Sequence, residues 1–319
     1  MRQGLVAVLL LLSVGAHAQQ KFGPPPRRLA KDLPIEIPDF RINITNLLVG
    51  RINPLGLENQ LRIGPQKKLY QSDSLLFRDN FVFFGFSPRV NPAFVKLGPS
   101  LELQFLSILN LRFGAELIYW FGTFNIYQSF GSALDEYSDS VLAMRGKDLG
   151  LSYRTSGGHF YIEPTFQVRF GPMALRNRFS FEYWNTNARA GDTVFYDQTL
   201  DTLVPTNGWI FSDDLDLLYL SKKRFVVGVR YSTVQTFYGP ENYRPGEDNT
   251  LNPNGHHRLG PLFAYTFFDK GYSRFNRPSL ILIVNWYAQH RYRTGADVHP
   301  GVPYVVLGFA FTSDLIPTP

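Results

Sequence analysis

The sequence of 319 residues contains no cysteine, so it has neither a disulfide framework nor a thiol nucleophile. Charged residues make up only 18%, against roughly 25% in an average soluble protein. After Val14, no apolar run approaches the roughly 20 residues that a membrane-spanning helix needs. Aromatic residues nevertheless reach 15%, while the mean hydropathy is only −0.13. Such a chain must interleave apolar and polar residues finely, which excludes both a bundle of transmembrane helices and intrinsic disorder.

Residues 1–18 have the form of a cleaved secretory signal peptide. Arg2 supplies the positive start, and a small-x-small cleavage site ends at Ala18. An uncleaved anchor is the alternative, but the apolar run is too short to span a bilayer. The following segment, 19–41, contains three consecutive prolines, which exclude a packed helix or a central strand. We expect a linker to the first strand there; the alternative is a basic tether for a partner protein.

The rest of the chain alternates apolar and polar residues with a period of two. In 159–170, for example, Phe160 and Phe166 lie on one face of an extended chain, and Glu163 and Arg169 lie on the other. Strands are expected at 42–50, 57–70, 79–88, 93–105, 111–121, 159–170, 175–183, 208–219, 223–237, 258–267, 280–292 and 302–312. The pattern predicts an all-β fold, namely an antiparallel up-and-down transmembrane β-barrel of about 12 strands.

The connections between these strands alternate in length. Short turns are expected near 107–110, 171–173 and 220–223, and long polar loops near 122–157, 188–207 and 238–256. This alternation places all long loops at one end of a barrel, and an even strand count places both termini at the other. Trp120, Trp184 and Trp209 fall near the long-loop ends and are predicted to form an aromatic girdle. A soluble β-sandwich is the structural alternative, although its strands are usually shorter.

Three features together carry a resemblance: the signal peptide, the alternating segments 160–170 and 179–183, and the terminal strand 302–311. In these features the chain resembles Gram-negative outer-membrane β-barrel proteins, as an architecture that covers about 42–312. The resemblance implies export to the outer membrane, contact with outer-membrane lipid and with the barrel assembly machinery, and a periplasmic location for 19–41. One departure is the tail 313–319, because such proteins often end on a terminal aromatic residue. Either the insertion signal is internal or the tail is tolerated.

The polar faces of the strands are predicted to line the lumen with nearly balanced charge. The predicted lumen-lining residues are Arg112, Glu116, Glu163, Arg169, Arg176, Arg178, Glu182, Asp214, Asp216, Arg230, Arg258 and Arg291. Charges in a narrow barrel lose solvent, so we expect cross-strand pairs between arginines and carboxylates. The expected lumen is occluded and braced by these pairs; the alternative is a polar channel whose arginines select anionic or polar solutes. Asp214 and Asp216 share a face and could instead hold a cation.

Candidate catalytic and metal-binding residues are few. Ser156 and His159 are considered as the pair of a lipid hydrolase, but no acid stands at a definite spacing, so a solvated histidine at the barrel rim is expected. His256 and His257 are adjacent, so in a strand they point to opposite faces and cannot form a two-ligand metal site. We find no phosphate loop, dinucleotide motif or nucleic-acid module. The sequence predicts no enzyme, no cofactor and no nucleic-acid partner.

Three functions remain open at this stage. A narrow channel or largely occluded barrel for small polar solutes fits the sequence best. A structural or accessory barrel of an envelope complex, for secretion or surface motility, would use its loops or the proline-rich segment to contact a protein partner. A lipid-modifying outer-membrane enzyme is the third, and it would need a serine, histidine and acid cluster facing lipid.

Overall fold

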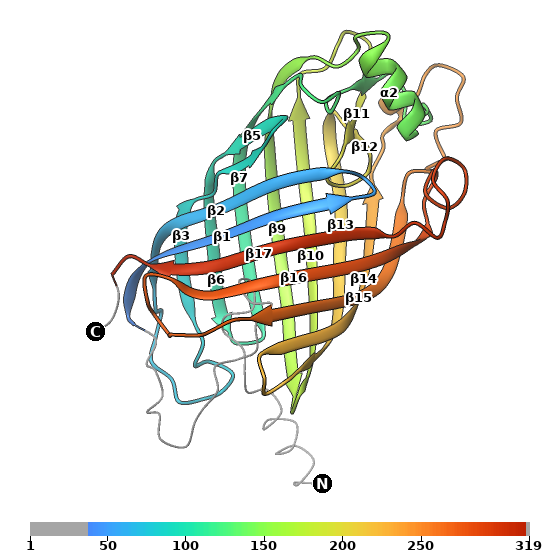
Figure 1. The fold of residues 1–319 in the computed structure, drawn as a ribbon. Coiled ribbons are helices and arrows are strands. Elements are labelled where there is room, and N and C mark those ends of the chain that lie inside the picture. Colours follow the sequence, from blue (N-terminus) through green and yellow to red (C-terminus); the bar gives the residue numbers. More distant parts are fainter. Residues whose placement is uncertain (1–37, 317–319) are drawn as a thin grey trace, which may run out of the picture.

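The chain forms a closed antiparallel β-barrel of twelve strands in a computed structural model, which describes residues 38–316 (Figure 1). The wall consists of β1 (Phe40–Ile52), β2 (Gly56–Lys67), β3 (Phe81–Phe86) continued by β4 (Arg89–Asn91), β5 (Phe94–Leu97) with β6 (Pro99–Leu106), β7 (Leu109–Phe121), β9 (Arg154–Phe170), β10 (Met173–Thr186), β13 (Asn207–Leu220), β14 (Phe225–Thr236), β15 (His256–Thr266), β16 (Asn276–Gln289) and β17 (Tyr304–Asp314). The predicted all-β, up-and-down barrel is therefore confirmed. The expected signal peptide lies outside the described residues.

The first and last strands close the barrel. β1 pairs with β17 from Asn43 opposite Asp314 to Ile52 opposite Val305, and its other edge pairs with β2. No strand edge of the wall is then left open, which is the condition for a β-structure in a membrane. The start of β1 and the end of β17 lie at the same rim, as the even strand count predicts.

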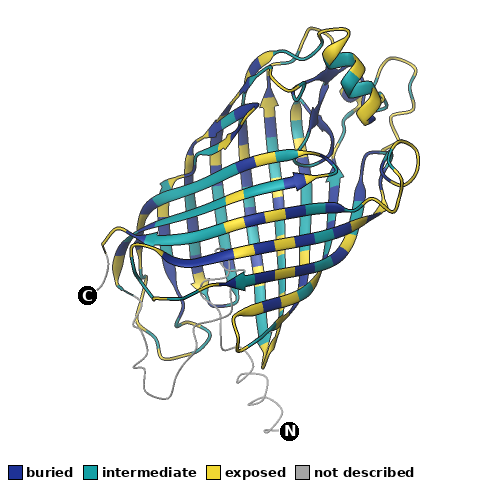
Figure 2. Cartoon of the chain, viewed as in Figure 1, coloured by how far each residue is buried: buried dark blue, intermediate teal, exposed yellow. Residues whose placement is uncertain are grey.

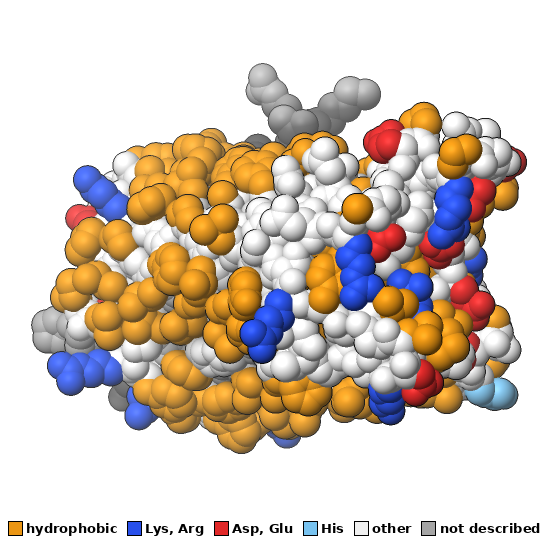
Figure 3. Space-filling view, turned by 90° about the horizontal axis from the view of Figure 1, so that it is seen from above, with side chains coloured by type: hydrophobic (Ala, Val, Ile, Leu, Met, Phe, Trp, Pro, Cys, Tyr) orange, Lys and Arg blue, Asp and Glu red, His pale blue; other side chains and the backbone are white. Residues whose placement is uncertain are grey.

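Side chains alternate between the outside and the inside of the wall, as Figure 2 shows along each strand. In β9, Phe160 and Phe166 point outward and are exposed, while Glu163 and Thr165 point inward and are buried. Hydrophobic side chains cover much of the outer wall (Figure 3). A soluble β-sandwich buries its apolar faces against each other, so this inverted arrangement excludes it.

Polar side chains interrupt this pattern in places, and one pair shows how the outer wall holds them. Asn177 and Asp213 lie at the outward-facing positions of β10 and β13, and the Asn177 amide donates a hydrogen bond of 2.6 Å to the Asp213 carboxylate. Both side chains are half-buried among neighbouring rings, including Phe179, which lies opposite Asp213. Their mutual hydrogen bond lowers the cost of holding polar groups on an apolar surface.

The long loops gather at one end of the barrel, as predicted. They contain β8 (Ser129–Phe130), α2 (Asp139–Lys147), β11 (Val194–Asp197), β12 (Thr202–Pro205) and the 3₁₀ helix η2 (Pro240–Asn242). The opposite end is not uniformly short, because 68–80 connects β2 to β3 there. Among the described residues, no helix has the length and apolar character required to cross a membrane.

A second, small sheet closes the end of the barrel that carries the long loops. It has the order β12-β11-β8, and all four residues of β11 and of β12 are buried. Phe195 and Val204 pack against inward-facing residues of the wall, including Ile118 of β7. We call the hairpin 194–205 the plug. The sequence did not predict it as strands, because strands buried on both faces show no alternation.

The assignment of inside and outside makes a testable prediction at two neighbouring residues of β9. Phe166 is 48% exposed on the outer wall, whereas Gln167 faces the lumen and donates a hydrogen bond of 3.0 Å to the Ser107 carbonyl. An arginine on the lipid-facing side of a barrel costs about 2–4 kcal/mol at the membrane midplane. Phe166→Arg should therefore lower the yield of folded barrel in lipid vesicles more than Gln167→Arg. Equal yields would mean that the register is shifted by one residue.

Candidate functional site in the barrel lumen

Charged side chains from neighbouring strands form ion-pair networks inside the barrel. In the first, Asp216 of β13 is fully buried and contacts Arg176 of β10 and Arg230 of β14. Arg230 Nε lies 2.7 Å from Asp216 Oδ1, and Arg176 Nε lies 2.9 Å from Asp216 Oδ2. Asp214, two residues earlier, accepts from Arg178 at 2.6 Å and lies 3.2 Å from Arg230. The predicted cross-strand pairs therefore exist here, and arginines occupy the place considered for a cation.

The second network is centred on His159. Its Nδ1 lies 3.0 Å from a Glu116 oxygen, and its Nε2 lies 2.9 Å from a Glu182 oxygen. Arg89 contacts the other Glu116 oxygen at 3.1 Å, and the Trp184 ring stacks on the imidazole with centroids 4.1 Å apart. The expectation of a solvated rim histidine is wrong, because the inward position places His159 between two acids in the interior.

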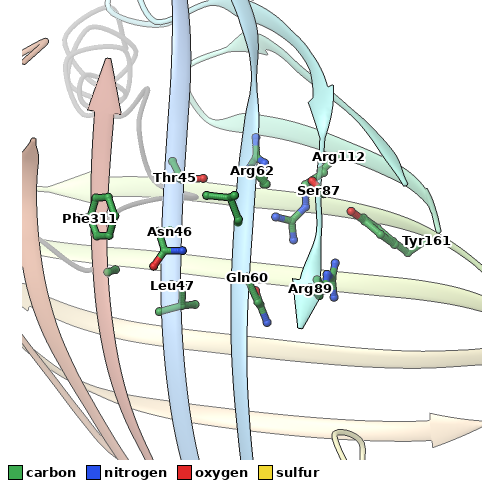
Figure 4. A pocket seen from close by; sticks show the side chains of 12 residues that line it. Thr45, Asn46, Leu47, Gln60, Arg62, Ser87, Arg89, Arg112, Tyr161 and Phe311 are labelled. Atoms are coloured by element: carbon green, nitrogen blue, oxygen red, sulfur yellow. The ribbon is translucent and has the colours of Figure 1, made fainter. Parts of the chain in front are cut away.

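The third group of charges lines a cavity with about 620 Å³ of free space, part of it open to solvent. Arg62, Arg89 and Arg112 all reach it, and Arg62 and Arg112 form ion pairs with Glu102 and Glu163. Its other lining residues include Thr45, Leu47, Gln60, Ser87, Tyr161 and Ala310. Figure 4 shows the three arginines grouped with Ser87 and Tyr161, across the cavity from β1. Three guanidinium groups and several hydroxyl and amide groups suit a polar or anionic solute.

Ten of the twelve predicted lumen residues lie at inward positions in the body of the wall, and two do not. Arg169 lies at the short-turn rim, where its Nε donates to the Gly171 carbonyl at 2.6 Å. Arg291 is not on a strand, because β16 ends at Gln289 rather than at residue 292. It lies in the loop that follows and donates to the carbonyls of Leu134 and Asp135. The prediction that Arg291 lines the lumen is therefore wrong.

Arg62 and Arg89 are cavity residues that were not among the predicted lumen residues. Arg62 lies on β2, a continuous strand of twelve residues, and Arg89 lies on β4, which has only three residues. A strand as short as β4 shows no alternation from which the inward side could be predicted. The available signal was the position of Arg62, which shares its side of β2 with Gln60 and Gln66.

The predicted aromatic girdle is correct in position for one tryptophan only. Trp209 points outward, is 43% exposed and packs on Tyr183 with ring centroids 5.2 Å apart. Trp120 and Trp184 instead point inward and are buried. Both pack against Phe195 of the plug, with ring centroids 5.7 and 5.5 Å apart, respectively. Each is an even number of residues from an inward-facing glutamate on its own strand, and therefore faces the lumen as well. The plug supplies an apolar surface for both rings to pack against. Their assignment to the girdle is therefore wrong.

A buried carboxylate anchors the plug. Asp201, at the turn of the hairpin, is 1% exposed and accepts hydrogen bonds from Tyr196 at 2.8 Å and Tyr287 at 2.9 Å. Arg293 Nη2 lies 2.9 Å from its Oδ1, and His290 Nε2 lies 3.2 Å from its Oδ2. Burial alone would raise the pKa of Asp201, but the hydrogen bonds from His290 and Arg293 and the charge of Arg293 hold it well below its ordinary value. We call these five residues the clamp.

The candidate catalytic and metal-binding residues are not brought together. Ser156 is exposed on the outer side of β9, whereas His159 faces the lumen. His256 is buried inside the barrel, and His257 points outward, where its Nδ1 lies 2.7 Å from the Tyr231 hydroxyl. Within residues 38–316, no group of three or more histidines, aspartates or glutamates could hold a metal ion.

Comparison with protein-family models and with curated proteins gives no match. Among solved structures, the KdgM porin aligns with a TM-score of 0.37 and 8% identity over 85% of this chain and 98% of its own. The NanC porin gives 0.39 and 9% over 86% and 100%. LpxR from Salmonella typhimurium gives 0.38 and 9% over 85% and 99%. Because these scores are low, the barrel assignment rests on the strand pairings of this chain itself.

The ion-pair networks predict unequal effects for two similar substitutions. Asp216→Asn removes the carboxylate that faces two largely buried arginines, which should lower the free energy of unfolding by about 3–5 kcal/mol. Asp135→Asn breaks a pair with Arg244, whose side chain is 51% exposed, and should cost about 0–1 kcal/mol. Urea unfolding of the two refolded variants in the same detergent measures both. Similar losses for the two would contradict a bracing role for the lumen network.

Proposed function

We propose that this protein is an outer-membrane β-barrel that acts as a narrow channel for small polar solutes, with a mild preference for anions. The observation that carries the proposal is a polar cavity lined by Arg62, Arg89 and Arg112 inside a closed barrel with an apolar outer wall. A wall of this kind is stable only where lipid surrounds it. Export by a cleaved signal peptide would deliver the chain to the outer membrane of a Gram-negative bacterium, through the barrel assembly machinery.

The long loops would face the cell exterior, and the rim that carries both ends of the wall would face the periplasm. In this orientation the plug closes the channel from outside. The plug is buried and clamped at Asp201, so the described conformation is a closed one. The resting channel should therefore conduct poorly, and opening requires that the hairpin moves away from Trp120 and Trp184.

A second function, a non-conducting accessory barrel of an envelope complex, is favoured by the same plug. The buried aromatic and ionic contacts that hold the hairpin are equally compatible with a barrel that is permanently closed and with one that opens at times. We propose that the protein is not an enzyme in either case, since Ser156 and His159 lie on opposite sides of the wall. Conductance separates the two functions, because only a channel gains current when the clamp is broken.

The membrane location can be checked before any conductance is measured. The protein should be recovered with the outer-membrane fraction and should migrate faster on a gel when it is loaded unheated, because a closed barrel resists detergent unfolding. Outward-facing residues such as Leu217 and Leu307, each more than half exposed, supply the apolar surface that detergent or lipid covers. Recovery in the soluble periplasm would rule out the membrane barrel.

Breaking the clamp should increase conductance in planar bilayers. Asp201→Asn removes the charge that Arg293 and His290 hold, so the plug should dissociate more often and single-channel openings should become more frequent. Asp248→Asn is the matched control, because Asp248 is exposed on a long loop and, among the described residues, its side chain accepts hydrogen bonds from Thr250 alone. The open current should reverse at a potential that shows a mild anion preference in a salt gradient.

Acid should act on the same clamp in a defined pH range. The pKa of Asp201 lies well below its ordinary value of 3.8 in the folded protein. The contribution of its charge to holding the plug closed is therefore complete above pH 3.8. The contribution is lost only as the pH falls further, through the lowered pKa. Openings should thus stay rare at neutral and mildly acidic pH.

Two outcomes of the conductance measurement would contradict the closed anion channel. A current of Asp201→Asn equal to that of the wild type would favour the accessory barrel. A large cation-selective current of the wild type would contradict both the closure and the anion preference.

A further inference from the structure

Two polar side chains in the barrel interior have hydrogen-bonding atoms without a partner. Asn285, on β16, is completely buried, and neither its Nδ2 nor its Oδ1 has a hydrogen-bond partner among the described residues. Arg258, on β15, has the same deficit at Nε and Nη1, and both atoms are shielded from solvent. A buried polar group without a partner costs free energy, and a buried guanidinium costs more. Both side chains are therefore candidates for binding a small polar or charged ligand.

The strand register brings the two residues together. Arg258 lies opposite Tyr287, and Asn285 lies two residues from Tyr287 on the same face of β16. Asn285 also lies opposite Tyr304 of β17, and the Arg258 guanidinium sits 4.1 Å from the centre of the Tyr304 ring. Such diagonal neighbours on adjacent strands are within reach of one small ligand.

The charges of this part of the wall leave a positive excess. Asp214 and Asp216 already face Arg230 and Arg176, and Arg178 adds a further positive charge. Arg258 forms no ion pair with a carboxylate in the described chain. A neutral water molecule would satisfy hydrogen bonds but adds no charge, and Asp214, whose charge acts on Arg258, is already paired with Arg178 and Arg230. An anion would accept hydrogen bonds from Arg258 and from the Asn285 amide nitrogen and would add the negative charge, whereas Asn285 Oδ1 would take its hydrogen bond from a water molecule beside the anion.

The plug contacts the wall next to these two residues, on the side of the long loops. The ring of His256, two residues before Arg258, lies with its Nε2 2.7 Å from the Leu200 carbonyl of the plug. Tyr287, opposite Arg258, donates to Asp201 at the plug turn. Arg258 and Asn285 thus lie on the wall next to the residues that hold the tip of the plug.

We propose that Arg258 and Asn285 form a binding site for one small monovalent anion, a halide or a small carboxylate, beneath the plug. Arg258 Nε and Nη1 and the Asn285 amide would donate hydrogen bonds to it. The site does not depend on conduction, since a permanently closed barrel would hold the same ion. A test in detergent therefore distinguishes its failure from failure of the proposed channel.

The decisive experiment is anomalous diffraction from wild-type crystals grown or soaked in bromide. The proposal expects an anomalous peak within hydrogen-bonding distance of both Arg258 and Asn285. A second arm replaces bromide with formate, for which planar density should appear at the same place. Ordered density without an anomalous signal in bromide, and without formate in the second arm, would identify a water molecule and overturn the proposal.

Thermal unfolding in detergent supplies a test without crystals. Chloride, titrated at constant ionic strength against a bulky sulfonate, should raise the melting temperature of the wild type, because a ligand bound only by the folded state stabilises it. Arg258→Gln and Asn285→Leu should lose this chloride-dependent shift. Arg244→Gln removes the same charge from an exposed ion pair and should keep it. An equal shift in all four proteins would place the chloride effect elsewhere and contradict the site.

Discussion

A charge buried inside the barrel costs free energy unless a group of opposite sign lies beside it, and this constraint organises the lumen. A twelve-stranded barrel is only somewhat wider than the eight-stranded barrels that side chains fill, so its inward charges lose much of their water. Asp216 illustrates the solution, since it is fully buried and is matched by arginines from the strands on either side. His159 illustrates it again, between two glutamates. The lumen is consequently braced across its strands.

The same constraint separates what could be predicted from the sequence and what could not. Period-two alternation is a local property, so the strands and the inward acids such as Glu163 and Asp216 followed from it. Trp120 and Trp184 were misplaced although their parity matches Glu116 and Glu182, because their position near the loops outweighed the alternation. Within a strand, alternation predicts the face of a side chain better than its distance from the loops does, because a shift of one residue moves a side chain to the opposite face.

The plug lay beyond sequence reasoning for a different reason. Its strands pack on both faces, so residues 194–197 and 202–205 lack alternation and read as loop. Its anchor depends on residues that are far apart along the chain, with Asp201 held by His290 and Arg293. Arg293 also binds Asp139 of α2, so one guanidinium joins the plug to a second long loop. No local pattern in the sequence announces such a contact.

Tyr287 connects the two features of the closed lumen that bear on function. It lies opposite Arg258 on one side of the plug contact, and its hydroxyl donates to Asp201 on the other. Asp201 at the plug turn is paired with Arg293, whereas Arg258 in the wall beneath it forms no ion pair with a carboxylate in the described chain. Because Tyr287 contacts Asp201 and lies opposite Arg258, a displacement of the plug would also change the surroundings of the proposed anion site. Any coupling between the position of the plug and occupancy of the proposed anion site would therefore run through this one side chain.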